Sequence, residues 1–175
     1  MIHVSVIVGS YGPFALSMIL GFVSLLLIVF ITSSNKEKIK NQLSELTMIN
    51  ELSVTVGLIM LTIGNFLGGM WANESWGRYW GWDPKENGAL LIVMWHLLVL
   101  HLRITGLAKP LDFAFYASLV NIIVVLAWFG VNLLSVGLHS YGFTDNVALN
   151  LFVFIAFELI FCTALYVKVK YFTSK

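Results

Sequence analysis

The chain has 175 residues, of which 59% are hydrophobic and only 11% carry a charge. A soluble domain of this length cannot bury so much apolar surface, so the composition indicates an integral membrane protein. The net charge of +1 argues against a nucleic acid as a partner, and the single cysteine excludes an internal disulfide framework.

Five segments are apolar over the roughly 20 residues that a helix needs to cross a bilayer. In chain order they are Val4–Thr32, Leu52–Met70, Gly88–Leu107, Phe113–Val136 and Val147–Val167. Between the first two, Ser33–Asn50 carries lysines and glutamates at helical spacing and is predicted to form a short solvated helix on the membrane surface. The sequence therefore predicts an all-α, polytopic membrane bundle of about five transmembrane helices, with residues 1–175 forming one domain.

The basic residues are unevenly divided between the two sides of this threading. Only Arg78 and Lys85 fall on one side. Eight fall on the other side: Lys36, Lys38, Lys40, Arg103, Lys109, Lys168, Lys170 and Lys175. Because basic loops remain in the cytoplasm, we predict that the N-terminus lies outside and the C-terminus inside. The predicted location is a bacterial inner (cytoplasmic) membrane.

The segment from residue 68 to residue 87 is unusually rich in tryptophan and glycine. Four of the six tryptophans fall within twelve residues. The aromatic residues of the segment are Trp71, Trp76, Tyr79, Trp80 and Trp82. Trp and Tyr favour membrane interfaces in any case, but an interfacial belt scatters its rings over many helix ends. A cluster of this density predicts an external loop that holds a large, flat, apolar ligand.

Two histidines reach the same predicted outer face as this loop. His3 stands at the outer end of the first span, and His139 lies between the last two spans. Each alone has an ordinary alternative, as a terminal or a loop residue. Together they offer two axial nitrogens beside aromatic rings, which is what haem iron with two histidine ligands requires. We predict that His3 and His139 ligate a non-covalent haem b, which the family resemblance described below implies is in transit.

Charged residues beside the tryptophans suit this site. Arg78 and Lys85 are candidates to pair with the two haem propionates, although Lys85 has alternatives in Glu86 and lipid phosphate. Asp83 and Pro84 fit the N-cap and the first turn of the helix that follows.

The segment Trp76–Glu86 (WGRYWGWDPKE), followed by His101 in a Leu-His-x-Arg pattern, resembles the tryptophan-rich "WWD" signature of the cytochrome c assembly family. The ending Asp-Pro-Lys-Glu is most similar to the CcsA-type branch (system II, also called ResC). The surroundings of His3 and His139 resemble the two external haem-ligand segments of that branch. The resemblance implies that the tryptophan loop binds haem, which is then delivered to Cys-x-x-Cys-His motifs of apocytochrome c outside the membrane.

The resemblance also implies partners. CcsA-type proteins carry further membrane helices ahead of the first external histidine and work with a CcsB-type (ResB-type) membrane partner. This chain resembles their C-terminal, haem-site portion, and we expect it to be the haem-presenting part of a cytochrome c haem lyase, inactive alone. His101 resembles the family's transmembrane histidine, a further haem ligand.

Two other interpretations remain open at this stage. One is a b-type cytochrome subunit in quinol electron transfer, which would leave the tryptophan loop without a purpose. The other is a haem exporter or holdase that performs no ligation.

Two polar residues inside the predicted spans are costly at membrane depth. His96 lies five residues before His101, about 500° around a helix, so the two cannot readily ligate one iron. We expect a structural role for His96. For Glu158 the sequence offers Asn121, Asn132 or His96 as partners and does not choose among them.

The charge asymmetry makes the topology testable. A cysteine introduced at residue 142 should react with a membrane-impermeant maleimide added outside, because it shares the predicted outer face with His3. Cysteines at Lys36, Lys40 or Lys175 should react only after the membrane is permeabilised. Equal outside labelling at residues 142 and 36–40 would contradict the threading.

Overall fold

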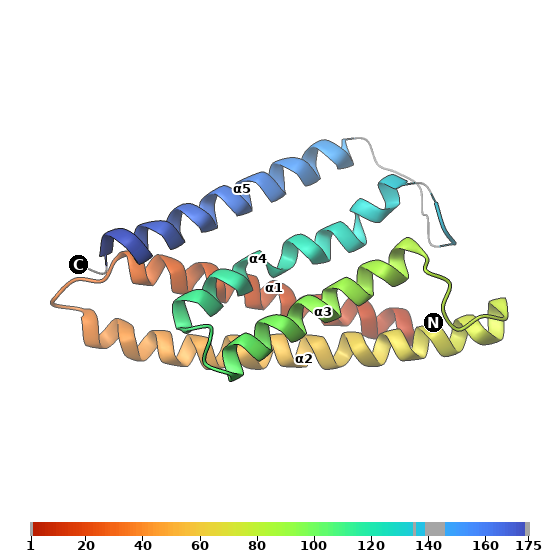
Figure 1. Ribbon diagram of the computed structural model, residues 1–175, viewed down its shortest axis with the longest axis horizontal. Coiled ribbons are helices and arrows are strands. Elements are labelled where there is room, and N and C mark those ends of the chain that lie inside the picture. Colours follow the sequence, from red (N-terminus) through yellow and green to blue (C-terminus); the bar gives the residue numbers. More distant parts are fainter. Residues whose placement is uncertain (1, 135, 139–145, 174–175) are drawn as a thin grey trace.

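The computed structural model describes residues 2–134, 136–138 and 146–173, and within these residues the only regular elements are helices (Figure 1). They are α1 (Ile2–Val29), α2 (Lys36–Trp76), α3 (Pro84–Ile104), α4 (Pro110–Trp128), the 3₁₀ segment η1 (Gly130–Leu134), α5 (Val147–Val167) and the π-helical segment η2 (Lys168–Thr173). Five helical segments are long and apolar enough to cross a membrane. This confirms the predicted all-α integral membrane class.

The helices run roughly side by side, so the connections gather at two ends of the bundle (Figure 1). The N-terminus and the α2–α3 connection lie at one end, which we call the His3 end. The α1–α2 turn, the α3–α4 turn and the end of α5 lie at the opposite, lysine-rich end, whose described basic residues are Lys36, Lys38, Lys40, Arg103, Lys109, Lys168 and Lys170. The charge division along the sequence is therefore a division between the two ends, and its orientation in the membrane stays a prediction.

The structure contradicts the prediction of a separate surface helix at Ser33–Asn50. Lys36–Asn50 is the first part of α2, which runs unbroken for 41 residues, or about 60 Å at 1.5 Å per residue. No Gly or Pro interrupts the sequence between Lys36 and Val56. The junction is also held inside the bundle, where buried Asn50 accepts a hydrogen bond of 2.6 Å from Ser17 Oγ on α1.

The fourth span is confirmed, but its helix changes type near its end. The sequence predicts a span over Phe113–Val136; the structure has an apolar helical span over Pro110–Leu133, in which α4 stops at Trp128 and the chain continues as η1. Gly130, a poor helix former, stands at this change. At the other boundary, α3 begins as predicted: Asp83 is its N-cap and Pro84 its first residue.

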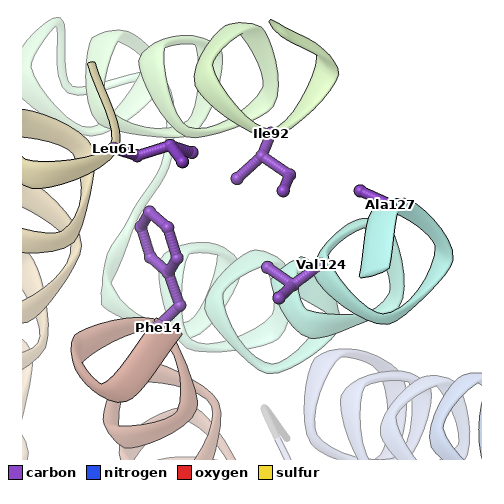
Figure 2. Close-up of a cluster of buried hydrophobic side chains, with 5 residues drawn as sticks. All are labelled: Phe14, Leu61, Ile92, Val124 and Ala127. Carbon is purple, nitrogen blue, oxygen red and sulfur yellow. The ribbon is translucent and has the colours of Figure 1, made fainter. Parts of the chain in front are cut away.

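The centre of the bundle is an apolar cluster to which each of α1–α4 contributes. Figure 2 shows Phe14, Leu61, Ile92, Val124 and Ala127 directed into one shared space. All five are buried, and the Phe14 ring is fully enclosed. This cluster holds α1, α2, α3 and α4 in the arrangement that positions the His3 end.

Helix α5 is attached more loosely and faces outward. Its buried Cys162 packs with Leu25 of α1 and Ala114 of α4. Phe152 and Ile160 are about 70% exposed, a surface suited to lipid or to other membrane helices.

The intramembrane polar residues occupy different environments. His96 is fully buried beside the Phe14 ring, 3.9 Å between centroids, and its Nδ1 donates to the Ile92 carbonyl at 2.6 Å. His101 is exposed, so the prediction that the two histidines point in different directions is confirmed. Glu158 is 1% exposed, and within the described residues no hydrogen bond joins it to Asn121, Asn132 or His96.

Removal of the Phe14 ring should cost about 3–5 kcal/mol of stability, because a fully enclosed aromatic side chain leaves a cavity that its neighbours cannot fill. The measurement is reversible unfolding of Phe14→Ala in mixed micelles with a rising fraction of denaturing detergent. Phe152→Ala, which removes an exposed ring from α5, is the matched control and should change stability far less. Equal losses would contradict the central role of this cluster.

Candidate ligand pocket at the His3 end

A pocket of about 200 Å³ lies at the His3 end, between the beginnings of α1 and α3 and the ends of α2 and α4. Six residues singled out from the sequence line it: His3, Trp71, Trp76, Tyr79, Trp80 and Lys85. Arg78 and Trp82 belong to the same segment but do not line it. His101 lies at the lysine-rich end, and His139 lies outside the described residues. The structure therefore brings one predicted haem ligand together with most of the aromatic cluster.

His3 begins a chain of ring contacts along one wall. Its imidazole lies 5.3 Å from the Trp71 ring, tilted by 33°. Trp71 in turn meets Trp76 edge-on, 5.0 Å between centroids. Edge-on and tilted contacts of this kind are favourable for aromatic rings. The wall therefore presents one imidazole and two indoles from two different helices.

The external loop predicted at residues 68–87 is helical at both of its ends. Trp71 and Trp76 belong to the last turns of α2, and α3 begins at Pro84, so only Gly77–Asp83 is non-helical. The helix ends at Gly77, where the backbone turns to a left-handed φ of 69°. Two of the tryptophans are consequently held by a rigid helix.

Glu86 organises the short connection. Its carboxylate accepts hydrogen bonds from the backbone N–H of Gly81 at 2.8 Å and of Asp83 at 3.1 Å, and it pairs with Arg78 at 3.2 Å. Between the two bonded amides, Trp82 has a φ of 57°, a left-handed conformation that costs a bulky residue about 1–3 kcal/mol. Glu86 thus holds a strained turn in place. The Asp-x-x-Glu capping pattern was the signal in the sequence that could have identified it.

Tyr79 forms another wall by lying flat on α2. A Cβ atom on Gly69 would stand 2.5 Å from the Tyr79 ring, so this contact requires glycine. The Tyr79 hydroxyl donates to the Phe66 carbonyl at 3.4 Å. The close approach places the phenol ring against the helix that carries Trp71.

Both cations of the segment have partners inside the protein. Arg78 pairs with Glu86 and lies 5.7 Å from the Trp76 ring centroid. Lys85 Nζ donates to the Trp128 carbonyl at 2.5 Å and lies in the pocket lining. Pairing with propionates stays a prediction for both, and the geometry favours Lys85.

Two aromatic residues of the pocket were missed by the sequence reasoning. Tyr11 and Trp128 line the pocket with ring centroids 4.8 Å apart. Tyr11 could have been found, because it stands eight residues after His3 and so near the same face of α1. Nothing in the sequence marks Trp128, which fell inside a predicted span.

The fold and the pocket define a polytopic membrane protein with an aromatic, histidine-bearing site at one end of its helices. Residues 1–139 match the family described as "Cytochrome C assembly protein", a range that includes the first four membrane-spanning helices and the tryptophan segment, and the chain belongs to this family.

Among relatives, Protein NrfI of Wolinella succinogenes is 44% identical over 149 residues, which are 82% of this chain and 16% of NrfI. The cytochrome c biogenesis protein CcsA of Chlamydomonas reinhardtii is 37% identical over 143 residues, 82% of this chain and 40% of that protein. CcsA of a Synechococcus species is 42% identical over 98 residues, 56% of this chain and 31% of that protein. The matched region is thus less than half the length of each of these relatives.

Loss of the Glu86 carboxylate should release the connection. Glu86→Ala removes three interactions from a half-buried turn and should lower stability by about 1–3 kcal/mol, with a change in tryptophan fluorescence as the rings reorient. Thermal unfolding monitored by intrinsic tryptophan fluorescence measures the change in stability, and the emission of the folded protein measures the reorientation of the rings. Glu74→Ala removes the same charge from an exposed position on α2 and should change neither. Matching curves for the two variants would contradict the role assigned to Glu86.

Proposed function

We propose that this chain holds haem in the pocket at the His3 end and presents it for covalent attachment to apocytochrome c, with His3 and His139 as the axial ligands. Membership of the cytochrome c assembly family supports a role in cytochrome c maturation. The observation that carries the finer proposal is the His3 imidazole in the wall of an aromatic pocket, 5.3 Å from Trp71.

The residues of the pocket suit haem as cargo. A neutral imidazole supplies an iron ligand, and indole and phenol rings pack against a flat apolar macrocycle. Lys85 in the lining offers a positive charge to a propionate. The volume of about 200 Å³ is below the ~300–1,000 Å³ of pockets that enclose a ligand. A ligand of haem size would therefore keep part of its edge exposed, which suits presentation better than storage.

The contribution of the protein to the reaction is positioning. Bound haem supplies two vinyl groups, and each acceptor thiol adds its S–H across one vinyl double bond, so no atom leaves. His3 and His139 hold the iron and fix the orientation of the ring. Trp71, Trp76 and Tyr79 cover one part of the macrocycle and exclude water from it.

A second haem-holding position at the lysine-rich end is part of the proposal. His101 is exposed on α3, with Nδ1 donating to the Leu97 carbonyl at 2.7 Å. An ionisable side chain on a membrane-spanning helix suggests a function and a partner for that side chain. We infer that this face meets a CcsB/ResB-type partner or further CcsA-like helices, with His101 directed to haem at the contact.

Family membership disfavours a b-type electron-transfer subunit. Export or storage of haem shares the binding step with presentation and differs only in whether the bound haem is transferred to an acceptor, so a transfer assay separates them.

The spectrum of the protein, purified with its membrane partner, tests the haem site. The wild type should carry non-covalent haem with the absorption of a bis-histidine complex. His3→Ala and His139→Ala should each lose that spectrum and regain it with added imidazole, because imidazole replaces the missing ligand. Ser5→Ala, an exposed neighbour of His3 on α1, is the control and should match the wild type.

Unchanged haem content in either histidine variant would refute the ligand assignment. A correct spectrum without transfer to added reduced apocytochrome c would favour the exporter or holdase.

A further inference from the structure

The carboxylate of Asp83 divides its two oxygens between two separate parts of the chain. Oδ1 accepts from the Lys85 N–H at 3.0 Å, which is the N-cap bond of α3. Oδ2 accepts from the N–H of Leu138 at 2.6 Å, 55 residues along the chain. A helix cap needs only the first bond, which a serine can also make. The second bond therefore has a purpose that capping does not explain.

The partner segment is shaped to this contact. Gly137 has a φ of 92°, a conformation that side chains other than glycine rarely adopt. A Cβ atom on it would overlap Asp83 Oδ2 and stand 2.9 Å from Pro84 Cδ. Asp83 is 5% exposed, so its charge is withdrawn from water and its hydrogen bonds to backbone N–H groups are of the strong, charge-assisted kind. The backbone of Gly137 thus lies directly against the start of α3, with no room for a side chain.

The contact joins two parts of the proposed site. Asp83 caps the helix whose first turns place Lys85, Glu86 and Ala89 in the pocket lining. Leu138 is covalently bonded to the next residue, His139. The bond from Leu138 to Asp83 therefore fixes the backbone of Leu138, the residue that precedes His139, relative to the pocket that contains His3.

We propose that Asp83 is a positioning residue that fastens the Gly137–Leu138 segment to the start of α3 and so sets the approach of His139 to the pocket. This inference rests on the proposed function, because it assigns Asp83 to one of the two ligands named there. Asp83 touches no reacting atom and acts through the backbone of Leu138. Partners that orient a metal ligand typically change metal affinity by about 10–100-fold when they are removed.

Three variants separate this role from helix capping. Asp83→Ser keeps an N-cap oxygen but has none to reach Leu138. Gly137→Ala keeps the Asp83 carboxylate and blocks the approach of the segment to it. Ser5→Ala is again the control. All are made in the full chain, purified with its membrane partner in lipid nanodiscs.

The first measurement is amide hydrogen exchange at single-residue resolution, which needs no haem. The Leu138 amide should exchange at least about tenfold faster in Asp83→Ser and in Gly137→Ala than in the wild type, because each variant removes its acceptor contact. The amides from Lys85 to Asn87 should stay protected in Asp83→Ser. Unchanged exchange at Leu138 in Asp83→Ser would overturn the inference, as would equal loss of protection throughout α3.

The second measurement is haem affinity from the bis-histidine spectrum. Both variants should bind haem at least about tenfold more weakly, and added imidazole should restore the spectrum as it does for His139→Ala. Faster exchange at Leu138 with unchanged haem affinity would overturn the positioning role. If His3→Ala and His139→Ala also leave haem unchanged, the proposed function itself fails, and the exchange data still decide whether the Asp83 contact exists.

Discussion

The first turn of α3 is the junction on which the His3 end depends. Within four consecutive residues, Asp83 caps the helix and binds Leu138, Lys85 reaches the carbonyl of Trp128, and Glu86 holds the α2–α3 connection. These bonds join the α2–α3 connection, α3, the end of α4 and the segment after η1. Each of them joins a side chain to a backbone group, and two of these groups, the Lys85 N–H and the Trp128 carbonyl, stand at helix ends, where backbone groups lack partners within their own helix. Side chains at the start of α3 thus hold the His3 end together.

The bundle below this junction follows a different rule. Inside a membrane every backbone polar group needs a partner in the protein, and helices supply these partners themselves. Among the buried side chains, Ser17 and Asn50 pair across α1 and α2 and His96 donates to its own helix, whereas Glu158 has no hydrogen-bond partner among the described residues. The apolar cluster around Phe14 then fills the remaining space.

The pocket at the His3 end and the opposite, lysine-rich end have different roles in the proposed function. At the His3 end the imidazole of His3 stands among rings carried by α1, α2 and α4, in a pocket of about 200 Å³. At the lysine-rich end His101 is turned outward from α3. The proposed function thus uses both ends, with the pocket for presentation of haem and the exposed His101 for contact with a membrane partner.

Most of the architecture could be derived from residue order. The spans, the Asp83 cap, and the placement of His3 with the tryptophans at one end follow from hydropathy and local capping rules, because these depend on neighbours in the chain. The continuity of α2 was also readable, since no Gly or Pro interrupts Lys36–Val56. The capping pattern would have identified Glu86, but not its bond to Gly81.

Contacts between distant residues required the tertiary structure. The pairing of Tyr11 with Trp128, the bond from Lys85 to the Trp128 carbonyl, and the contact of Leu138 with Asp83 each join elements far apart in sequence. Their geometry follows from how α1, α3 and α4 pack around Phe14, and no periodicity encodes it. The sequence could therefore nominate Arg78 and Lys85 alike as partners of an anionic ligand. Only packing turned Arg78 to Glu86 and left Lys85 in the pocket wall, because the position of a side chain depends on the helices that surround it.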